Sequence, residues 1–150
     1  MAEWGAKVTG MDIAPDLIQY AKLHNSHPNL NYLVGNISEI PLQEKFDIIS
    51  MVDVIEHIPS NRIYRSISEL KRISHKDTII YINTPDIDFS NYMMAKYPNT
   101  KQIVENPYHP HKLAEMFHDY SFYLAKFDIY GTSNNPREYN EYWFKRNGGD

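Results

Sequence analysis

The chain has 150 residues, of which 42% are hydrophobic and 23% charged, which fits one folded domain and excludes a wholly disordered protein. Its formal net charge of −4 gives no sign of the basic surface that nucleic-acid binding needs. Cysteine is absent, so disulfides and thiolate metal sites are excluded. No apolar run approaches the ~20 residues that span a bilayer. The first residues do not have the pattern of a signal peptide. We therefore expect a cytoplasmic protein.

In the first half of the chain, the sequence predicts strands separated by helices. Leu17, Ile18, Ala21 and Tyr20 predict one apolar helix stripe, and a second helix is predicted by the apolar residues Ile63, Ile67, Leu70 and Ile73. The predicted strands are residues 7–12, 30–34, 46–52 and 78–83. This alternation is typical of a parallel sheet with crossover helices.

Residues 46–52 form a near-continuous apolar run that ends in the ionisable residues Asp53, Glu56 and His57. Such a short run predicts a fully buried strand in the interior of a parallel sheet. In open α/β sheets, ligands bind beyond the carboxyl ends of the strands. The three ionisable side chains are therefore candidate site residues.

The second half of the chain predicts a different arrangement. Residues 87–110 are expected to be an irregular insertion or lid, because they carry three prolines. A short helix is expected at residues 112–118, followed by strands at 123–130 and 141–146. These last strands lack room for a crossover helix, so we expect an antiparallel pair at one sheet edge. The expected fold is a single α/β domain over residues 1–150, doubly wound and mostly parallel, with this antiparallel pair at its C-terminus.

Three stretches of the sequence carry a resemblance to a known family. They are Val-Thr-Gly-Met-Asp-Ile-Ala-Pro at residues 8–15, Gly-Asn-Ile at residues 35–37 and Asp-Val-Ile-Glu-His-Ile at residues 53–58. Together they resemble class I S-adenosylmethionine-dependent methyltransferases, in particular the ubiquinone-biosynthesis O-methyltransferase group. The resemblance implies a Rossmann-like fold, S-adenosylmethionine as cofactor, and methyl transfer to an oxygen or nitrogen atom of a small-molecule acceptor.

The resemblance also implies which residues bind the cofactor. Asp12 and Ile13 match the end of the family's second strand, where an acid accepts hydrogen bonds from both ribose hydroxyls. Asn36 and Ile37 match the adenine-binding segment, although many relatives have aspartate where this chain has Asn36. Asp53 is the remaining expected cofactor contact.

For Asp53, Glu56 and His57 three interpretations stay open. In the related O-methyltransferases, residues at these positions are associated with a divalent cation such as magnesium near the acceptor hydroxyl. Alternatively, His57 is a general base, since its ordinary pKa near 6.5 allows it to take a proton at neutral pH. The structural alternative is that the three residues cap the turn and pack at the sheet edge. We expect these three residues to be catalytic. We assign no metal site, but the same three residues are the candidate ligands if a metal binds.

The chain also departs from the family pattern. No glycine-rich loop precedes the first predicted strand, so the resemblance implies an N-terminally truncated methyltransferase domain. This departure leaves open an inactive remnant or partner subunit that cannot bind the cofactor. A nicotinamide-dependent oxidoreductase is a further alternative, because its second strand also ends in an acid.

Two other residue groups have a functional and a structural interpretation. His109 and His111 are one residue apart, which in an extended segment puts both rings on one side as in a metal-ligand pair. The alternative is that they start the following helix. Tyr92, Tyr97 and Tyr108 either line an acceptor pocket or pack the insertion onto the sheet.

Overall fold

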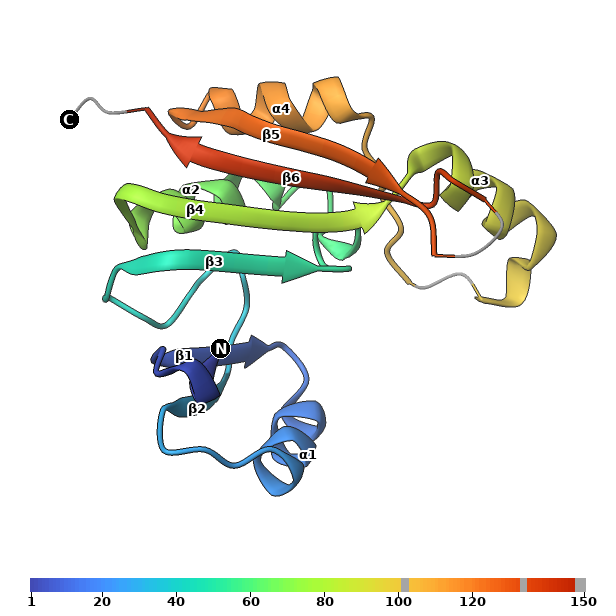
Figure 1. Ribbon diagram of the computed structural model, residues 1–150. Helices are drawn as coiled ribbons and strands as arrows, with labels where there is room; N and C mark the ends of the chain where they lie inside the picture. The colour runs from blue at the N-terminus through green and yellow to red at the C-terminus, as the bar shows by residue number, and fades with distance from the viewer. Residues whose placement is uncertain (101–102, 133–134, 148–150) are drawn as a thin grey trace. The chain divides into compact units, whose positions relative to one another are not determined.

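The computed structural model describes residues 1–100, 103–132 and 135–147 (Figure 1). The chain divides into two compact units, Met1–Leu42 and Gln43–Asp150, and each is described by itself. Among the described residues, no helix is long and apolar enough to cross a membrane.

The first unit contains a two-stranded parallel sheet. Its elements are η1 (Ala2–Trp4), β1 (Val8–Asp12), α1 (Pro15–His24) and β2 (Leu30–Val34). Both predicted strands are confirmed, and Asp12 lies opposite Val34 at the carboxyl ends of the pair. The predicted apolar stripe of α1 is only partly correct, because Ile18 is buried whereas Leu17 and Tyr20 are each 59% exposed.

The second unit is built on a four-stranded sheet with the order β3-β4-β6-β5. Its strands are β3 (Phe46–Val52), β4 (Ser74–Pro85), β5 (Phe122–Tyr130) and β6 (Tyr139–Arg146), and its helical segments are η2 (Ile55–His57), α2 (Ile63–Arg72), α3 (Ile87–Lys96), η3 (Pro98–Thr100) and α4 (Pro110–His118). β3 and β4 are parallel, whereas β6 is antiparallel to both β4 and β5. The predicted antiparallel pair at a sheet edge is therefore confirmed.

The core of the second unit lies between this sheet and the helices α2 and α4. The predicted stripe of α2 is confirmed, since Ile63, Ile67 and Leu70 are all buried. From α4, Phe117 stacks on Phe144 of β6 with ring centroids 4.3 Å apart. Apolar burial of this kind is the main stabilising contribution to folding, so α2, α4 and the sheet form one packed structure.

The prediction that β3 is a fully buried interior strand is wrong. Within its sheet β3 pairs only with β4 and occupies an edge. Ile48 and Val52, on one face of the strand, are 50% and 53% exposed, whereas Met51 on the other face is buried. The apolar run shows what the strand is able to bury. It carries no information about which elements cover each face.

The expectation of an irregular segment at residues 87–110 is wrong for residues 87–96, which form α3, whereas residues 103–109 belong to no helix or strand. The buried Asp86 is the N-cap of this helix, and its carboxylate accepts hydrogen bonds from the backbone N–H groups of Asp88 and Phe89. An N-cap aspartate satisfies amide groups that lack partners inside the helix. The prolines at 98, 107 and 110 all lie outside α3 or at the first position of α4, where proline is tolerated.

Candidate functional site

Asp12 lies at the carboxyl end of the sheet in the first unit. The backbone N–H of Gly35 donates to its carbonyl oxygen at 2.9 Å, which joins the ends of β1 and β2. In its side chain, Oδ1 accepts from the N–H of Ala14 at 2.8 Å. No hydrogen bond to Oδ2 is found within the described part of the chain. One carboxylate oxygen thus fixes the turn into α1, and the other remains for a ligand.

Asn36 directly follows the same end of β2, and its side chain is already engaged. Its Oδ1 accepts from both the backbone N–H and the hydroxyl of Ser38, at 2.9 and 2.7 Å. These two donors use both lone pairs of the carbonyl oxygen. Acceptance of a further hydrogen bond, the role that an aspartate would have at this position, is therefore disfavoured. The amide Nδ2 of Asn36 is the group that is left to donate a hydrogen bond to a ligand. Ile13, 67% exposed, and the half-buried Ile37 flank the same end of the sheet.

In the second unit, the turn after β3 brings Asp53, Glu56 and His57 together. The backbone N–H of Asp53 donates to the carbonyl of Asn83, so the turn is tied to the end of β4. Asp53 itself has a φ of 51°, in the left-handed region that aspartate tolerates better than most residues. The short helix η2 then carries Glu56 and His57. It ends before Pro59, as a residue preceding proline disfavours helix.

Glu56 is almost fully buried, with 3% of the residue exposed. Its Oε2 accepts a hydrogen bond from the hydroxyl of Thr84 at 2.9 Å. Its Oε1 is buried, and no hydrogen bond to it is found among residues 1–100, 103–132 and 135–147. Burial raises the pKa of this carboxyl, and the hydrogen bond from Thr84 and the nearby His57 oppose that shift. A buried carboxylate oxygen without a partner is costly, which makes it a candidate for a functional contact.

His57 lies beside Glu56, with Nε2 3.8 Å from Glu56 Oε1 and 26% of its side chain exposed. Its Nδ1 is 2.9 Å from the backbone carbonyl of Val104. A carbonyl oxygen only accepts, so Nδ1 must carry the hydrogen in this contact. In the neutral ring, Nε2 then has the free lone pair. His57 is therefore arranged to accept a proton on the nitrogen nearest Glu56.

Charge and aromatic rings surround this turn. The carboxyl of Asp53 has a pKa raised by partial desolvation, an effect that His57 opposes. The pKa of Tyr139 is raised by burial and then by the negative charge of Asp53. Tyr139 stacks on Tyr130 with centroids 5.6 Å apart, and Tyr130 Oη accepts from Asn83 Nδ2 at 3.0 Å.

Thr84, Asn83, Tyr130 and Tyr139 were not predicted as site residues. Thr84 and Asn83 could have been predicted from the sequence, because they lie at the end of β4, the strand that pairs in parallel with β3. The tyrosines come from the far end of the chain, and only the antiparallel pairing of β6 with β4 places Tyr139 opposite Pro85.

Metal ligation finds no support in the geometry. Within residues 1–100, 103–132 and 135–147, no group of three or more histidine or acidic side chains is arranged to hold a metal ion. His109 and His111 stack on each other, with centroids 5.6 Å apart, where α4 begins. The two histidines thus lie at the start of the helix, which is the structural interpretation given for the pair in the sequence analysis.

The tyrosines of the predicted insertion are distributed differently from either expectation. Tyr92 and Tyr97 are 54% and 44% exposed, and Lys96 Nζ lies 5.3 Å from the centroid of each ring. Tyr108 is half-buried, and its hydroxyl has no hydrogen-bond partner within the described ranges. Of the two interpretations, packing onto the sheet does not fit the exposure of Tyr92 and Tyr97.

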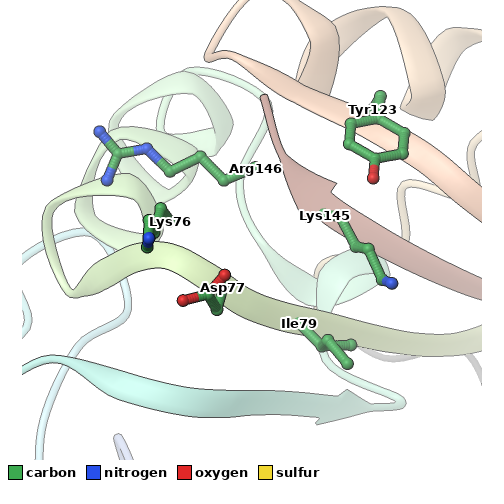
Figure 2. A pocket seen from close by; sticks show the side chains of 6 residues that line it. All are labelled: Lys76, Asp77, Ile79, Tyr123, Lys145 and Arg146. Atoms are coloured by element: carbon green, nitrogen blue, oxygen red, sulfur yellow. The ribbon is translucent and has the colours of Figure 1, made fainter. Parts of the chain in front are cut away.

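A shallow basic hollow lies toward the opposite end of β4 from Thr84. It is lined by Lys76, Asp77, Ile79, Tyr123, Lys145 and Arg146 (Figure 2). The register places Ile79, Lys145 and Tyr123 in one row across β4, β6 and β5. None of the predicted site residues lines this hollow.

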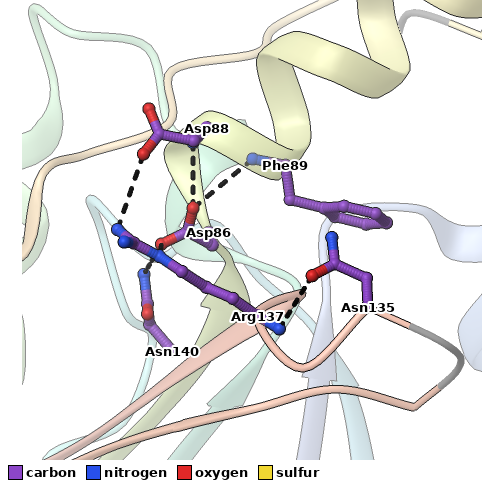
Figure 3. Close-up of polar contacts among 6 residues, drawn as sticks. All are labelled: Asp86, Asp88, Phe89, Asn135, Arg137 and Asn140. Atoms are coloured by element: carbon purple, nitrogen blue, oxygen red, sulfur yellow. Dashed lines mark hydrogen bonds and ion pairs between the residues drawn. The ribbon is translucent and has the colours of Figure 1, made fainter.

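An ion pair joins the start of α3 to the segment before β6, and a hydrogen bond joins it to β6 itself (Figure 3). Arg137 Nε donates to Asp86 Oδ2 at 3.1 Å, and Asn140 Nδ2 donates to the same oxygen at 3.3 Å. Burial by itself would raise the pKa of Asp86, but these hydrogen bonds, together with those from the helix N–H groups, bring it below its ordinary value. The bonds hold the end of β4, and with it Thr84, in a fixed place.

Comparison with known proteins adds an independent line of evidence. Residues 1–82 match the family described as "Methyltransferase domain". The ubiquinone biosynthesis O-methyltransferase of Glaesserella parasuis is 32% identical over 102 residues, which cover 63% of this chain and 42% of that protein. The chain therefore spans less than half the length of this relative.

Two solved structures show the same fold at low sequence identity. A SAM-dependent methyltransferase from Methanosarcina mazei superposes with a TM-score of 0.78 at 17% identity, covering 97% of this chain and 84% of the other. The magnesium protoporphyrin IX methyltransferase from Synechocystis PCC 6803, solved with bound SAH, gives a TM-score of 0.72 at 18% identity, covering 97% and 67%. The Rossmann-like mixed sheet with antiparallel C-terminal strands is thus confirmed. This chain belongs to the methyltransferase domain family of class I S-adenosylmethionine-dependent enzymes.

Proposed function

We propose that this chain carries out S-adenosylmethionine-dependent methyl transfer to an oxygen or nitrogen atom of a small molecule, with His57 as the proton acceptor. One observation carries the proposal. The buried Oε1 of Glu56, which has no hydrogen-bond partner among the described residues, lies 3.8 Å from the nitrogen of His57 that keeps its lone pair. This arrangement follows β3 at its carboxyl end, where ligands bind in open α/β sheets.

The residues of the first unit fit the nucleoside part of the cofactor. Asp12 Oδ2 is the carboxylate oxygen that the turn does not use, and a carboxylate accepts hydroxyl hydrogens well. Because both lone pairs of Asn36 Oδ1 are engaged with Ser38, the Nδ2 group would donate to a ring nitrogen of adenine. When bound, S-adenosylmethionine supplies a methyl group activated by the positive charge on sulfur.

The residues of the second unit then manage one proton. His57 Nε2 takes the proton of the acceptor hydroxyl or amine, which increases the nucleophilicity of the acceptor atom. The resulting imidazolium is stabilised by the negative charge of Glu56, whose Oε1 gains a charged neighbour. We assign no step to a metal, because the described residues form no three-ligand group.

The acceptor class is inferred from the relatives. Proteins named for ubiquinone biosynthesis and for magnesium protoporphyrin IX act on small organic molecules by their names, which supports a small-molecule acceptor here. A cytoplasmic location remains a prediction from the sequence.

Replacing Asp12 by alanine is expected to weaken binding of S-adenosylhomocysteine. Each charge-assisted hydrogen bond lost costs about 1.5–3 kcal/mol, which is roughly a 10- to 150-fold increase in Kd per bond. Binding by the variant is therefore expected to be weak. NMR titration of the whole chain suits weak binding, because it reports changes at named residues.

The matched control is Asp16→Ala, which removes an exposed acid from the first turn of α1 and should leave Kd unchanged. Equal affinity of Asp12→Ala and the unmodified chain would refute the ribose role of Asp12. If the unmodified chain shows no shifts at any cofactor concentration, the proposed binding of the cofactor by this chain is refuted.

A further inference from the structure

The segment that follows α3 and η3 returns to the turn after β3 and contacts three consecutive residues there. We call residues 103–106 the return segment. The backbone N–H of Asn106 donates to the carbonyl of Glu56 at 2.8 Å. The side-chain Nδ2 of Asn106 donates to the carbonyl of Ile58 at 2.9 Å. Between these two bonds, the carbonyl of Val104 accepts from His57 Nδ1 at 2.9 Å.

We propose that the return segment is a positioning element that fixes the tautomer of His57, with Val104 supplying the acceptor and Asn106 anchoring the segment. The inference rests on the proposed function, in which Nε2 of His57 is the proton acceptor. A neutral histidine carries one ring hydrogen, and the partner of one nitrogen decides where it lies. Holding the hydrogen on Nδ1 leaves the lone pair on Nε2, the nitrogen 3.8 Å from Glu56 Oε1.

The surroundings of His57 explain why its tautomer has to be fixed. Glu56 Oε1 lies 3.8 Å from Nε2, beyond hydrogen-bond range. Nevertheless, a negative charge at this place would attract a hydrogen on Nε2, and the nearby Asp53 adds to that attraction. The Nε2–H tautomer would have no lone pair on the nitrogen that is to accept the acceptor's proton. The carbonyl of Val104 opposes this tautomer, because only an Nδ1–H group is able to donate to it.

The proposal can be tested by substituting Asn106, since a side-chain substitution at Val104 would not remove its backbone carbonyl. Its Nδ2 bond to Ile58 holds the return segment against η2, and without it the carbonyl of Val104 is less firmly placed. Asn106→Ala is expected to lower the ratio of Nδ1–H to Nε2–H tautomer of His57 by about fivefold, which corresponds to one hydrogen bond of about 1 kcal/mol. Asn91→Ala, at an exposed position of α3, is the matched control and should leave the ratio unchanged.

The measurement is the two-bond ¹H–¹⁵N spectrum of the whole chain labelled at histidine, at a pH where the imidazoles are neutral. The unmodified chain should show His57 as the Nδ1–H tautomer, and Asn106→Ala should shift His57 alone among the histidines. If Asn106→Ala fails to fold, the near-isosteric Asn106→Asp removes the same donor. A predominant Nε2–H tautomer in the unmodified chain, or an unchanged ratio in a folded Asn106 variant, would overturn the proposal. The spectrum needs neither cofactor nor acceptor, so a failure of methyl transfer would leave this result standing.

Discussion

Replacing His57 by alanine is expected to lower the turnover of methyl transfer by about 10²–10⁴-fold, the usual contribution of a general base. The loss follows from the position of Nε2, which keeps a free lone pair 3.8 Å from Glu56 Oε1. Binding of S-adenosylhomocysteine should change little, because His57 is assigned to the acceptor's proton and has no assigned contact with the cofactor. The measurement is release of S-adenosylhomocysteine with a panel of phenolic and amine acceptors, alongside the cofactor Kd.

His75→Ala is the matched control for this experiment. His75 lies near the amino end of β4 and contacts Asp47 at 3.0 Å, away from the turn that carries His57. Its replacement should leave turnover near the unmodified value. Full turnover in His57→Ala, at any pH and in the presence of a chelator, would leave only a structural role for this histidine.

Replacing Asp86 by alanine is expected to destabilise the second unit by about 3 kcal/mol, the lower end of the range for breaking a buried ion pair. The carboxylate is fully buried, and it caps α3 while accepting bonds from Arg137 and Asn140. The lower end applies because the side chain of Arg137 is 51% exposed and recovers water contacts. Urea denaturation followed by far-UV circular dichroism gives the free energy of unfolding.

Asp88→Ala provides the comparison on the same helix. The side chain of Asp88 is 73% exposed and lies 3.5 Å from Arg137, so its loss should cost less than about 1 kcal/mol. If Asp86→Ala and Asp88→Ala destabilise the protein equally, the buried network does not have the role assigned to it.

The stability contributed by Asp86 should also depend on pH in a defined direction. Because the pKa of Asp86 is lowered in the folded protein, its contribution is fully present above the ordinary value of about 3.9. It is lost as the pH falls below that value and through the folded pKa. The difference in unfolding free energy between the unmodified chain and Asp86→Asn should therefore shrink between pH 5 and about pH 2. A constant difference over that interval would contradict the lowered pKa.

The secondary structure was largely predictable because local patterns report local geometry. The spacing of Ile63, Ile67 and Leu70 indicates which side of α2 is buried, and burial of all three confirms it. The lack of room for a crossover helix between β5 and β6 was likewise sufficient to predict their antiparallel pairing. The prediction missed α3 because the prolines at 98, 107 and 110 indicate irregular structure for the whole range 87–110, although all three lie outside the helix. Its cap depends on Asp86, whose other partners, Arg137 and Asn140, lie more than 50 residues along the chain.

The sequence by itself determined that strands ending in Asp12 and Val52 lead into polar turns, and that the turn after Val52 carries Glu56 and His57. These features depend on residues that are neighbours in the chain. Only the tertiary structure decided that Oε1 of Glu56 is buried without a hydrogen-bond partner in the part of the chain that the structure describes. It also decided that Asn36 Oδ1 is occupied by Ser38 and that Val104 holds Nδ1 of His57. It also decided that β3 lies at the edge of its sheet. Hydrogen-bond partners and strand neighbours are set by the packing of distant segments, and no local pattern of apolar and polar residues encodes them.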